Sequence, residues 1–445
     1  MIHMLQDNGH SAYVVGGCVR DSILNRRVHD WDICTSATPA EMLEIFKDKK
    51  IIETGLQHGT ITVVLDGETY EITTYRIDGV YSDNRRPDSV EFTDRLEEDL
   101  KRRDFTINAM AYNDDVGIID PFGGMIDLKD QTIRCVGSPK ERFDEDALRI
   151  LRAIRFAAQL DFSIDYKTSN EVLKNCENLN NISMERINSE FCKIAASPSF
   201  SKFLLKYFIV FWVFIPELVD MVRFEHNNPC HEFDVFFHTY HALRYCNSED
   251  LIVMLAVLFH DIGKPHCYQD TEGGIRRFSG HWEKSEEMTD IIMRRMRFDN
   301  YTRERVLELV FWHDFVIEAD KPSVKRMLNE IGEEQFWRLL EVKKADAKAH
   351  TLEYARNKLR EIEAVEKILK DVIKNSECFS LNDLAINGKD LIQLGFKQGK
   401  EIGEVLDRLL QDVIDESLKN EKDVLLQFAR LIYINDYVLP KHIGV

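Results

Sequence analysis

Hydrophobic and polar residues follow two different periods along the chain. Up to about residue 135, short apolar runs predict strands at 13–15, 61–65, 69–75 and 117–119. From about residue 139 onward, apolar residues recur every three or four positions, which is typical of amphipathic helices. The pattern therefore predicts an α/β head followed by a long helical body.

The helical part divides where its composition changes. Asn227-Asn228-Pro229 has the residues of a chain break, and the segment after it is rich in histidine. The last stretch is charged and contains a further break near Asn387-Gly388. We expect a head at 1–138, a helical neck and body at 139–226, a histidine-containing helical domain at 227–350 and a helical tail at 351–445.

Composition places the chain among globular proteins of the cytoplasm. Hydrophobic residues make up 44% and charged residues 30% of the 445 positions, which is ordinary for a soluble protein. The nine cysteines show no paired metal-binding spacing, so we expect reduced thiols, and the N-terminus lacks a signal-peptide pattern. The apolar run 207–215 ends at Pro216 and is too short to cross a bilayer, so we expect no membrane partner.

The net charge of −19 at first argues against a nucleic-acid partner. Net charge does not locate a patch, however, and basic residues cluster at 101–103, at 149–155 and at 294–305. An acidic protein with such basic stripes can hold a structured RNA, and its binding should then depend strongly on salt.

The segment after the first predicted strand carries the residues of a phosphate and metal site. Gly16-Gly17 predicts a tight turn in which backbone N–H groups can approach a phosphate, and Arg20 follows in a predicted helix. Asp30 and Asp32 are one residue apart, so on a strand both carboxylates face one side. Paired carboxylates suit Mg²⁺. A lone Gly-Gly is usually only a turn, and a lone Asp-x-Asp is usually a solvated loop.

This order, with the segments 99–112, 120–128 and 142–162 downstream, resembles the signature of class II nucleotidyltransferases, which include CCA-adding tRNA nucleotidyltransferases and bacterial poly(A) polymerases. The resemblance implies a polymerase-β-like head in which Asp30, Asp32 and Glu71 are catalytic. It also implies that Arg103 pairs with phosphate and that Asp104, with Asn108 one helical turn later, accepts from a ribose hydroxyl. The polar segment 76–87 resembles the loop that helps to switch such enzymes from CTP to ATP.

The resemblance assigns base recognition to the segment 142–162. Asp146 and Arg149 are three residues apart, which predicts neighbours on one helix face that hydrogen-bond the edge of the incoming base. Arg152 and Arg155 would continue that face toward the triphosphate, and Glu185-Arg186 would brace the site. Without the resemblance, an Asp–Arg pair at this spacing is usually a surface salt bridge.

A second metal site is predicted in the histidine-containing domain. The series His238, His260-Asp261, His281, His313 and Asp346, with Lys264 in HDIGKP, resembles the HD phosphohydrolase superfamily. The resemblance implies one divalent metal on His238, His260, Asp261 and Asp346, a second on His281 and His313, and a phosphate contact from Lys264. The sequence does not select the metal. A solitary His-Asp pair would usually belong to a hydrophobic core.

Taken together, these motifs predict template-independent addition of C, C and A to the tRNA 3′ end from CTP and ATP, with Mg²⁺ in the head, release of pyrophosphate and tRNA contacts from the tail. Addition of A alone, or poly(A) synthesis, remains open because both share the base-reading pair. The alternative of another class is an HD-type phosphohydrolase of nucleotides or RNA ends, with the head serving to bind RNA.

Overall fold

The computed structural model describes residues 1–28, 30–53, 55–79 and 89–435. It divides the chain into two compact units, Met1–Val219 with Ile292–Phe298, and Asp220–Ile291 with Asp299–Val445. Most of the loop predicted at 76–87 lies outside the described residues. Within the described ranges, none of the helices has both the length and the apolar character needed to cross a membrane.

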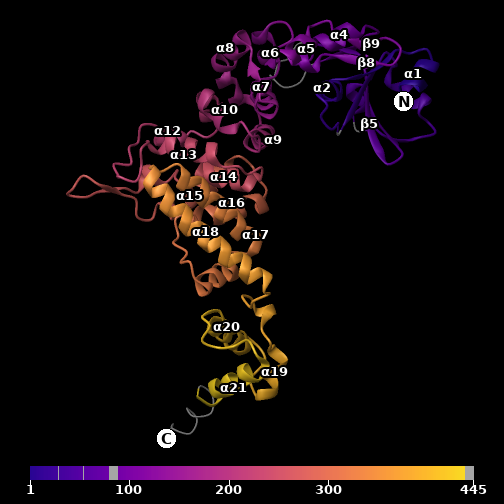
Figure 1. The fold of residues 1–445 in the computed structure, drawn as a ribbon. Helices are drawn as coiled ribbons and strands as arrows, with labels where there is room; N and C mark the ends of the chain where they lie inside the picture. The colour runs from indigo at the N-terminus through magenta and orange to yellow at the C-terminus, as the bar shows by residue number, and fades with distance from the viewer. Residues whose placement is uncertain (29, 54, 80–88, 436–445) are drawn as a thin grey trace. The chain divides into compact units, whose positions relative to one another are not determined.

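The first unit begins with a mixed sheet (Figure 1). Its seven strands have the order β3-β4-β5-β2-β1-β8-β9, and β2 and β5 are the parallel neighbours. The predicted α/β head with a helical body after it is confirmed. The strands of this sheet are β1 (Ala12–Val15), β2 (Trp31–Thr35), β3 (Lys50–Ile52), β4 (Thr60–Leu65), β5 (Glu68–Thr74), β8 (Ala111–Asn113) and β9 (Gly117–Ile119); β6 (Arg76–Asp78) pairs with β7 (Val90–Phe92).

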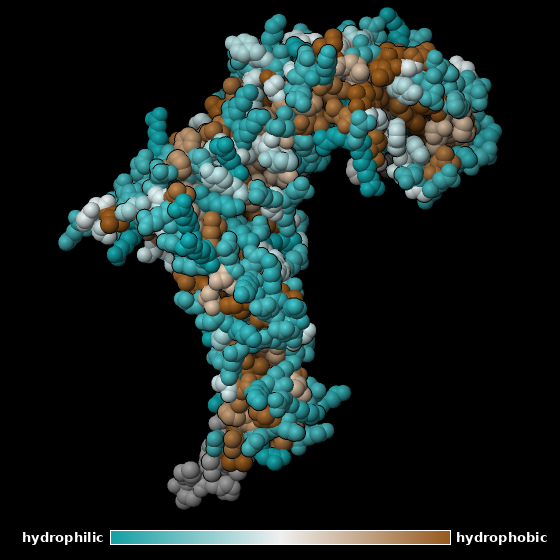
Figure 2. Space-filling view, in the orientation of Figure 1, coloured by the Kyte–Doolittle hydropathy of each residue, from teal (hydrophilic) through white to brown (hydrophobic). Residues whose placement is uncertain are grey.

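Alternation along β2 separates a packed face of the sheet from a functional one. Ile33 joins the buried cluster formed with Leu5 and Met42, whereas Asp32 lies on the other face, as Cys34 does. Figure 2 shows hydrophobic residues gathered over β8 and β9, where Tyr112 and Ile118 are exposed. The helices of the head are α1 (Ile2–Asp7), α2 (Gly17–Ile23), α3 (Pro39–Ile45), α4 (Leu96–Lys101) and α5 (Gly124–Lys129), with short 3₁₀ turns at Leu56–His58 and Thr106–Asn108.

The rest of the first unit is helical and rich in aromatic contacts. Phe191 packs edge-on against Phe200, Phe211 and Phe214, which accounts for burial of much of the apolar run 207–215. The helices are α6 (Pro139–Glu145), α7 (Leu148–Leu160), α8 (Tyr166–Lys174), α9 (Met184–Ala195), α10 (Phe200–Lys206), α11 (Phe208–Trp212) and α12 (Leu218–Met221), with a 3₁₀ segment at Cys176–Asn181 and the paired strands β10 (Thr132–Ile133) and β11 (Ser163–Ile164).

The second unit is almost entirely helical. The helices α17 and α18 lie side by side (Figure 1), and α17 contains a non-helical residue at Gly332 (φ 77°, ψ 169°). Its helices are α13 (Val235–Tyr245), α14 (Leu251–Phe259), α15 (His281–Arg295, whose last residues join the first unit), α16 (Asn300–Trp312), α17 (Lys321–Lys348), α18 (Leu352–Lys374), α19 (Gly388–Leu394), α20 (Lys400–Ile414) and α21 (Lys422–Tyr433), with 3₁₀ turns at Lys264–His266 and Leu381–Asp383 and a hairpin of β12 (Gln269–Asp270) and β13 (Arg276–Arg277).

Candidate active sites

The Gly16-Gly17 turn connects β1 to α2 and lies against functional side chains. Gly16 has φ 77° and ψ −130°, a conformation that L-residues rarely adopt. A Cβ at Gly16 would lie 2.9 Å from Arg103 Nη1 and 3.8 Å from Asp32 Oδ2. The backbone therefore approaches the carboxylate and the guanidinium closely only because this residue lacks a side chain.

We expect Gly16→Ala to lower nucleotide transfer at least tenfold and the free energy of unfolding by about 1–3 kcal/mol, because the new Cβ meets Arg103 and strains the backbone. The matched control is Gly67→Ala, which has φ 84° but open space around it. Both variants should unfold at lower denaturant concentration, and transfer should fall only in Gly16→Ala. Equal transfer rates in the two variants would contradict a role for this turn.

The predicted catalytic carboxylates come together on neighbouring strands. Asp32 on β2 is in register with Glu71 on β5, and Asp30 is exposed just before β2. Burial raises the pKa of Asp32 despite the nearby Arg103 guanidinium, and Asp30 adds to the increase. Burial, Asp32 and Asp30 together raise the pKa of Glu71. Because these carboxylates repel one another, they fit a divalent cation, which would remove the repulsion.

A chain of hydrogen bonds connects the predicted phosphate and ribose contacts. Arg20 Nη1 donates to Asn108 Oδ1 at 2.7 Å, and Asn108 Nδ2 donates to Asp104 Oδ1 at 3.2 Å. Arg152 Nη2 lies 2.6 Å from Asp104 Oδ2. Burial alone would raise the pKa of Asp104, but the charges of Arg152 and Arg149 outweigh it and lower the pKa to about 2. Asp104 is therefore an ionised hydrogen-bond acceptor at neutral pH.

Positive charge converges on one aromatic ring near this chain of bonds. The guanidinium carbons of Arg20, Arg152 and Arg155 lie 5.0, 5.4 and 4.2 Å from the centre of the Phe156 ring. Like charges held this close repel one another, and a polyanion among them would reduce that repulsion. The arrangement is suited to a triphosphate.

The structure corrects the local geometry predicted for Asp104 and Asn108. Their side chains do meet, but no continuous helix carries them. The helix α4 ends at Lys101, and Asn108 closes a 3₁₀ turn just before β8. One physical reason is that the Asp104 carboxylate accepts from the backbone N–H of Phe105, which favours a turn.

The prediction that Asp146 and Arg149 share one helix face is wrong. Asp146 is extended (φ −143°, ψ 104°) between α6 and α7, where its Oδ1 accepts from the N–H of Leu148 at 3.0 Å and its Oδ2 accepts from Arg186 Nη2 at 2.8 Å. Arg149 instead pairs with Glu145 and donates to the carbonyls of Arg142 and Arg102. The two groups are thus held separately, each by its own partners.

Two further buried carboxylates escaped the sequence reasoning. Arg155 Nε lies 3.1 Å from Glu190 Oε2, and both residues are buried, so this arginine is partly neutralised before any triphosphate binds. Asp99 lies 2.8 Å from Arg102 and 3.5 Å from Arg103. The i,i+3 and i,i+4 spacing of Asp99 could have revealed its role, whereas Glu190 comes from a different helix and gave no local signal.

In the second unit, the predicted histidine series converges on Asp261. Asp261 Oδ2 lies 3.2 Å from His260 Nε2 and 3.6 Å from His238 Nε2, and its Oδ1 lies 3.5 Å from His281 Nε2 and 3.7 Å from His313 Nε2. Asp346 Oδ1 lies 2.9 Å from His238 Nε2. We call these groups, namely His238, His260, Asp261, His281, His313 and Asp346, the histidine centre. Lys264 Nζ reaches Asp261 Oδ2 at 2.6 Å.

Hydrogen bonds to the backbone orient the imidazoles toward Asp261. The Nδ1 atoms of His260, His281 and His313 lie 2.8, 2.8 and 2.6 Å from the carbonyls of Val257, Phe278 and Val310. A carbonyl requires an N–H at Nδ1, which leaves the lone pair of a neutral imidazole on Nε2. The Nε2 lone pairs of His281 and His313 then face each other at 3.1 Å, an arrangement that a bound cation would stabilise.

Burial keeps two imidazoles of the histidine centre neutral, whereas the Asp261 charge favours the protonated form of a third. Burial lowers the pKa of His281 and of His238 to about 4, so both are neutral near pH 7. Burial opposes protonation of His260 too, but Asp261 outweighs it and raises the pKa of His260 to about 10. Both Asp261 oxygens and His260 Nε2 are buried, and none of these three atoms has a partner that meets the geometry of a hydrogen bond. The donor set therefore fits divalent cations, whose binding would displace the proton of His260.

The sequence reasoning did not single out other histidines next to the histidine centre. His231 stacks on His226 with ring centres 3.7 Å apart, and His231 and His350 with His238 place ligand atoms within 4.8 Å of one another. The position of His350, one helical turn after Asp346, was a usable signal. His226 and His231 lie in an irregular segment, where spacing is uninformative.

Comparison with known proteins identifies the family. Family models match residues 12–134 ("Poly A polymerase head domain") and 269–429 ("tRNA nucleotidyltransferase domain 2"). The chain is 35% identical to the CCA-adding enzymes of Lactobacillus helveticus and Enterococcus faecalis, covering 96% and 97% of this chain and 95% and 94% of those proteins.

Solved structures extend this similarity to the fold of nearly the whole chain. The Bacillus stearothermophilus CCA-adding enzyme in complex with CTP matches with a TM-score of 0.69 and 27% identity, covering 99% of this chain and 97% of that one. The Thermotoga maritima CCA-adding enzyme complexed with tRNA_CCA gives 0.57 and 22%, covering 96% and 92%. By its sequence over nearly its full length, this chain belongs to the CCA-adding enzymes, the class II tRNA nucleotidyltransferases.

Proposed function

We propose that the first unit adds C, C and A in turn to the 3′ end of tRNA, taking CTP and ATP and releasing pyrophosphate. The observation that supports this proposal most strongly is a cluster of three carboxylates beside a glycine turn and an arginine cluster. The carboxylates belong to Asp30, Asp32 and Glu71. Similarity to enzymes solved with CTP and with tRNA_CCA supports the choice of nucleotide and acceptor.

In this proposal each group of the head has one task. Asp30, Asp32 and Glu71 would hold Mg²⁺, which when bound acidifies the RNA 3′-hydroxyl and offsets charge on the α-phosphate. Arg20 and Arg152 bind the triphosphate and stabilise the negative charge that develops on the leaving pyrophosphate. The ionised Asp104 accepts from the ribose hydroxyl, which favours ribonucleotides over deoxyribonucleotides. No covalent enzyme intermediate and no nucleic-acid template are required.

Base selection is assigned to Asp146 and Arg149, although not through a shared helix face. Arg186 orients Asp146 by donating a hydrogen bond to its Oδ2, and backbone carbonyls that accept from Arg149 orient that side chain. Fixed acceptors on Asp146 and fixed donors on Arg149 can pair with the edges of cytosine and adenine. Uracil and guanine would leave buried polar groups unpaired, which is unfavourable.

We expect Arg186→Met to raise misincorporation of UTP and GTP relative to CTP by about tenfold, because Asp146 loses the hydrogen bond that orients it. Competition between labelled nucleotides on a tRNA lacking CCA measures this ratio. Glu185→Gln is the matched control, because Glu185, which was predicted to brace the site with Arg186, is exposed in the structure and lies 3.9 Å from Arg297 instead. Unchanged selectivity in Arg186→Met would remove Arg186 from the positioning of Asp146.

A specific observation favours a second activity, hydrolysis of phosphate esters at the histidine centre. Imidazole Nε2 atoms from α13 and from the ends of α14, α15 and α16 converge on Asp261, and Lys264 adds a buried cation. His238, His260, Asp261 and Asp346 would hold one divalent metal and His281 and His313 another; when bound, the metals would acidify water and polarise a phosphoryl oxygen. Lys264 would contact the phosphate. The metal is left open among Mn²⁺, Ni²⁺, Fe²⁺ and Mg²⁺.

Pyrophosphate release tests the transferase directly. Full-length protein with Mg²⁺, CTP, ATP and tRNA lacking CCA should release one pyrophosphate for each nucleotide added. Chelation by EDTA should stop both the release and the addition, and added Mg²⁺ should restore them. Incorporation without pyrophosphate, or in the presence of excess EDTA, would argue against the proposed chemistry.

A further inference from the structure

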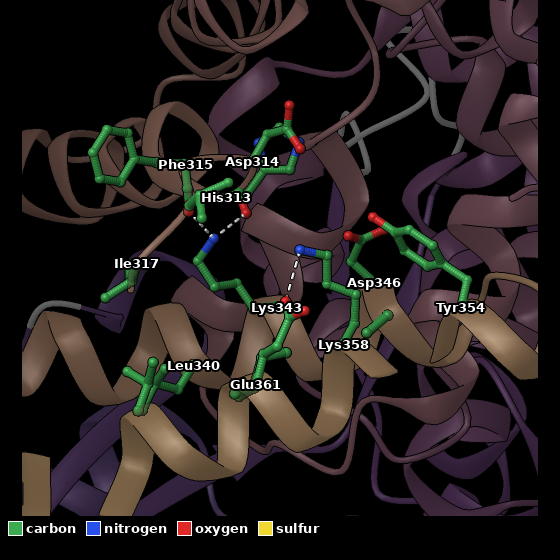
Figure 3. Close-up of a pocket in the computed structure, with 14 residues that line it drawn as sticks. His313, Asp314, Phe315, Ile317, Leu340, Lys343, Asp346, Tyr354, Lys358 and Glu361 are labelled. Atoms are coloured by element: carbon green, nitrogen blue, oxygen red, sulfur yellow. Dashed lines mark hydrogen bonds and ion pairs between the residues drawn. The ribbon is translucent and has the colours of Figure 1, made fainter. Parts of the chain in front are cut away.

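A cavity of about 240 Å³ adjoins the histidine centre between α17 and α18 (Figure 3). His313 and Asp346 of the histidine centre form part of its wall, and Tyr354, Lys358 and Glu361 line it from α18. Pockets for drug-sized ligands span roughly 300–1,000 Å³, so this cavity suits one ring system with its sugar. It therefore lies where the organic group of a phosphate ester would extend from the histidine centre.

The walls of this cavity combine apolar surface with fixed polar groups. Leu340, Ile362 and Val365 form an apolar part. Lys343 is half-buried there, but its Nζ donates to the carbonyls of His313 and Phe315 at 2.6 and 2.7 Å, as Figure 3 shows. That cation is already used to hold the end of α16, so Leu340, Ile362 and Val365 provide the apolar contact for a ring among otherwise polar groups of the wall.

The rim of the cavity offers a donor and an acceptor side by side. Lys358 Nζ donates to Glu361 Oε2 at 2.9 Å, and the Glu361 side chain is 61% exposed (Figure 3). Tyr354 stacks against His350, with ring centres 4.6 Å apart, and burial raises the pKa of Tyr354 to about 12, so its hydroxyl stays protonated. A nucleobase has the matching character, since its faces are apolar and its edge carries donors and acceptors.

A second cavity, of about 340 Å³, adjoins the same centre and has both basic and acidic side chains in its wall. It shares His313, Asp314, Asp346 and Tyr354 with the first cavity and is also lined by Lys264, Arg276 and Arg277. Arg276 is paired with Asp270 at 2.7 Å, whereas Arg277 is exposed. Arg277 can therefore meet the phosphate of an ester from this side, whereas Leu340, Ile362 and Val365 line the cavity between α17 and α18.

We propose that the cavity between α17 and α18 is the specificity subsite of the histidine centre and receives the nucleoside of a nucleoside monophosphate, free or at the end of an RNA. The inference rests on the hydrolase activity proposed above. The phosphate lies at the histidine centre with the second cavity beside it. Water forms the new P–O bond, the P–O bond to the nucleoside breaks, and the nucleoside oxygen leaves with a proton from the water.

Filling the cavity tests the proposal on the full-length protein. Val365→Phe should lower kcat/KM for adenosine 5′- and 3′-monophosphates and for an RNA ending in a 3′-phosphate by about tenfold or more, mainly through KM. Hydrolysis of ribose 5-phosphate, which lacks a base, should change less than about twofold. Equal losses on both classes of ester, or no loss on either, would overturn the subsite. The relative losses on mononucleotides and on RNA identify the source of the nucleoside.

A surface variant and a binding measurement keep the test decisive if Val365→Phe folds poorly. Glu361→Gln changes an exposed side chain and should alter the preference between adenine and uracil esters, while Glu363→Gln on the same helix should not. Hydrogen–deuterium exchange should show that adenosine 3′-monophosphate protects residues 340–365 without added metal. Protection there without hydrolysis of any ester would refute the hydrolase and retain the subsite; no protection would refute the subsite.

Discussion

Asp32→Asn is expected to lower nucleotide transfer by about a thousandfold or more, while hydrolysis at the histidine centre continues. Asp32 lies in register with Glu71 and interacts electrostatically with Arg103. Replacing its carboxylate with the amide of asparagine would therefore remove a negative charge from the middle of the proposed Mg²⁺ site. Loss of several kcal/mol of stabilisation for the developing charge corresponds to this change in rate. Single-turnover addition of labelled CTP to tRNA measures it.

The control for Asp32→Asn is another Asp→Asn change in the head. Asp66 is exposed in the turn between β4 and β5 at φ 54°, a conformation that asparagine tolerates. Asp66→Asn should therefore transfer nucleotides at the rate of the unmodified protein. If Asp32→Asn also retained more than a tenth of that rate, Asp32 would not be a catalytic ligand.

Asp261→Asn is expected to impair the hydrolysis of phosphate esters and to leave nucleotide transfer intact. Hydrolysis of phosphate esters should fall by about a thousandfold and bound divalent metal by as much as about two ions per chain, because Asp261 faces imidazoles on both of its oxygens. Transfer to tRNA should be unchanged. Metal analysis of the purified protein and the rate of ester hydrolysis give the two measurements.

Two further variants separate metal loss from unfolding in Asp261→Asn. Asp407→Asn, on the exposed side of α20, should keep both metal and hydrolysis. His281→Gln should lose metal with less disturbance, since it leaves the Asp261 charge in place beside His260. Full metal content in both Asp261→Asn and His281→Gln would show that the histidine centre does not bind metal.

Local patterns were sufficient for the parts of the fold that depend on neighbours in sequence. Alternating β-branched residues predicted β1, β4, β5 and β9 to within a residue or so at each end. The edge strand β3 and the short strands β6 to β8 were missed; each has only three residues, a length at which the pattern revealed β9 but not the others. Their pairing is decided by the rest of the sheet.

The errors at the candidate sites have a tertiary cause. The spacing of Asp146 and Arg149 fits a helix. In the structure, however, Asp146 has an extended backbone and accepts hydrogen bonds from the N–H of Leu148 and from Arg186, forty positions away. Arg155 was predicted to face the triphosphate together with Arg152, but it already pairs with Glu190, which comes from α9. By contrast, the ordered histidine series was predicted from its resemblance to the HD phosphohydrolases, and each member lies in or at the end of a helix.

The most direct test of the central claim follows the 3′ ends of three tRNAs that end before CCA, after C and after CC. Each is incubated with the full-length protein, Mg²⁺, CTP and ATP, separately and together, and the products are sequenced. Our account predicts that all three grow to CCA and stop there, with CTP alone adding only the missing C residues. Addition of A to the CC-ended tRNA alone, long A tails, or no incorporation at all would contradict it.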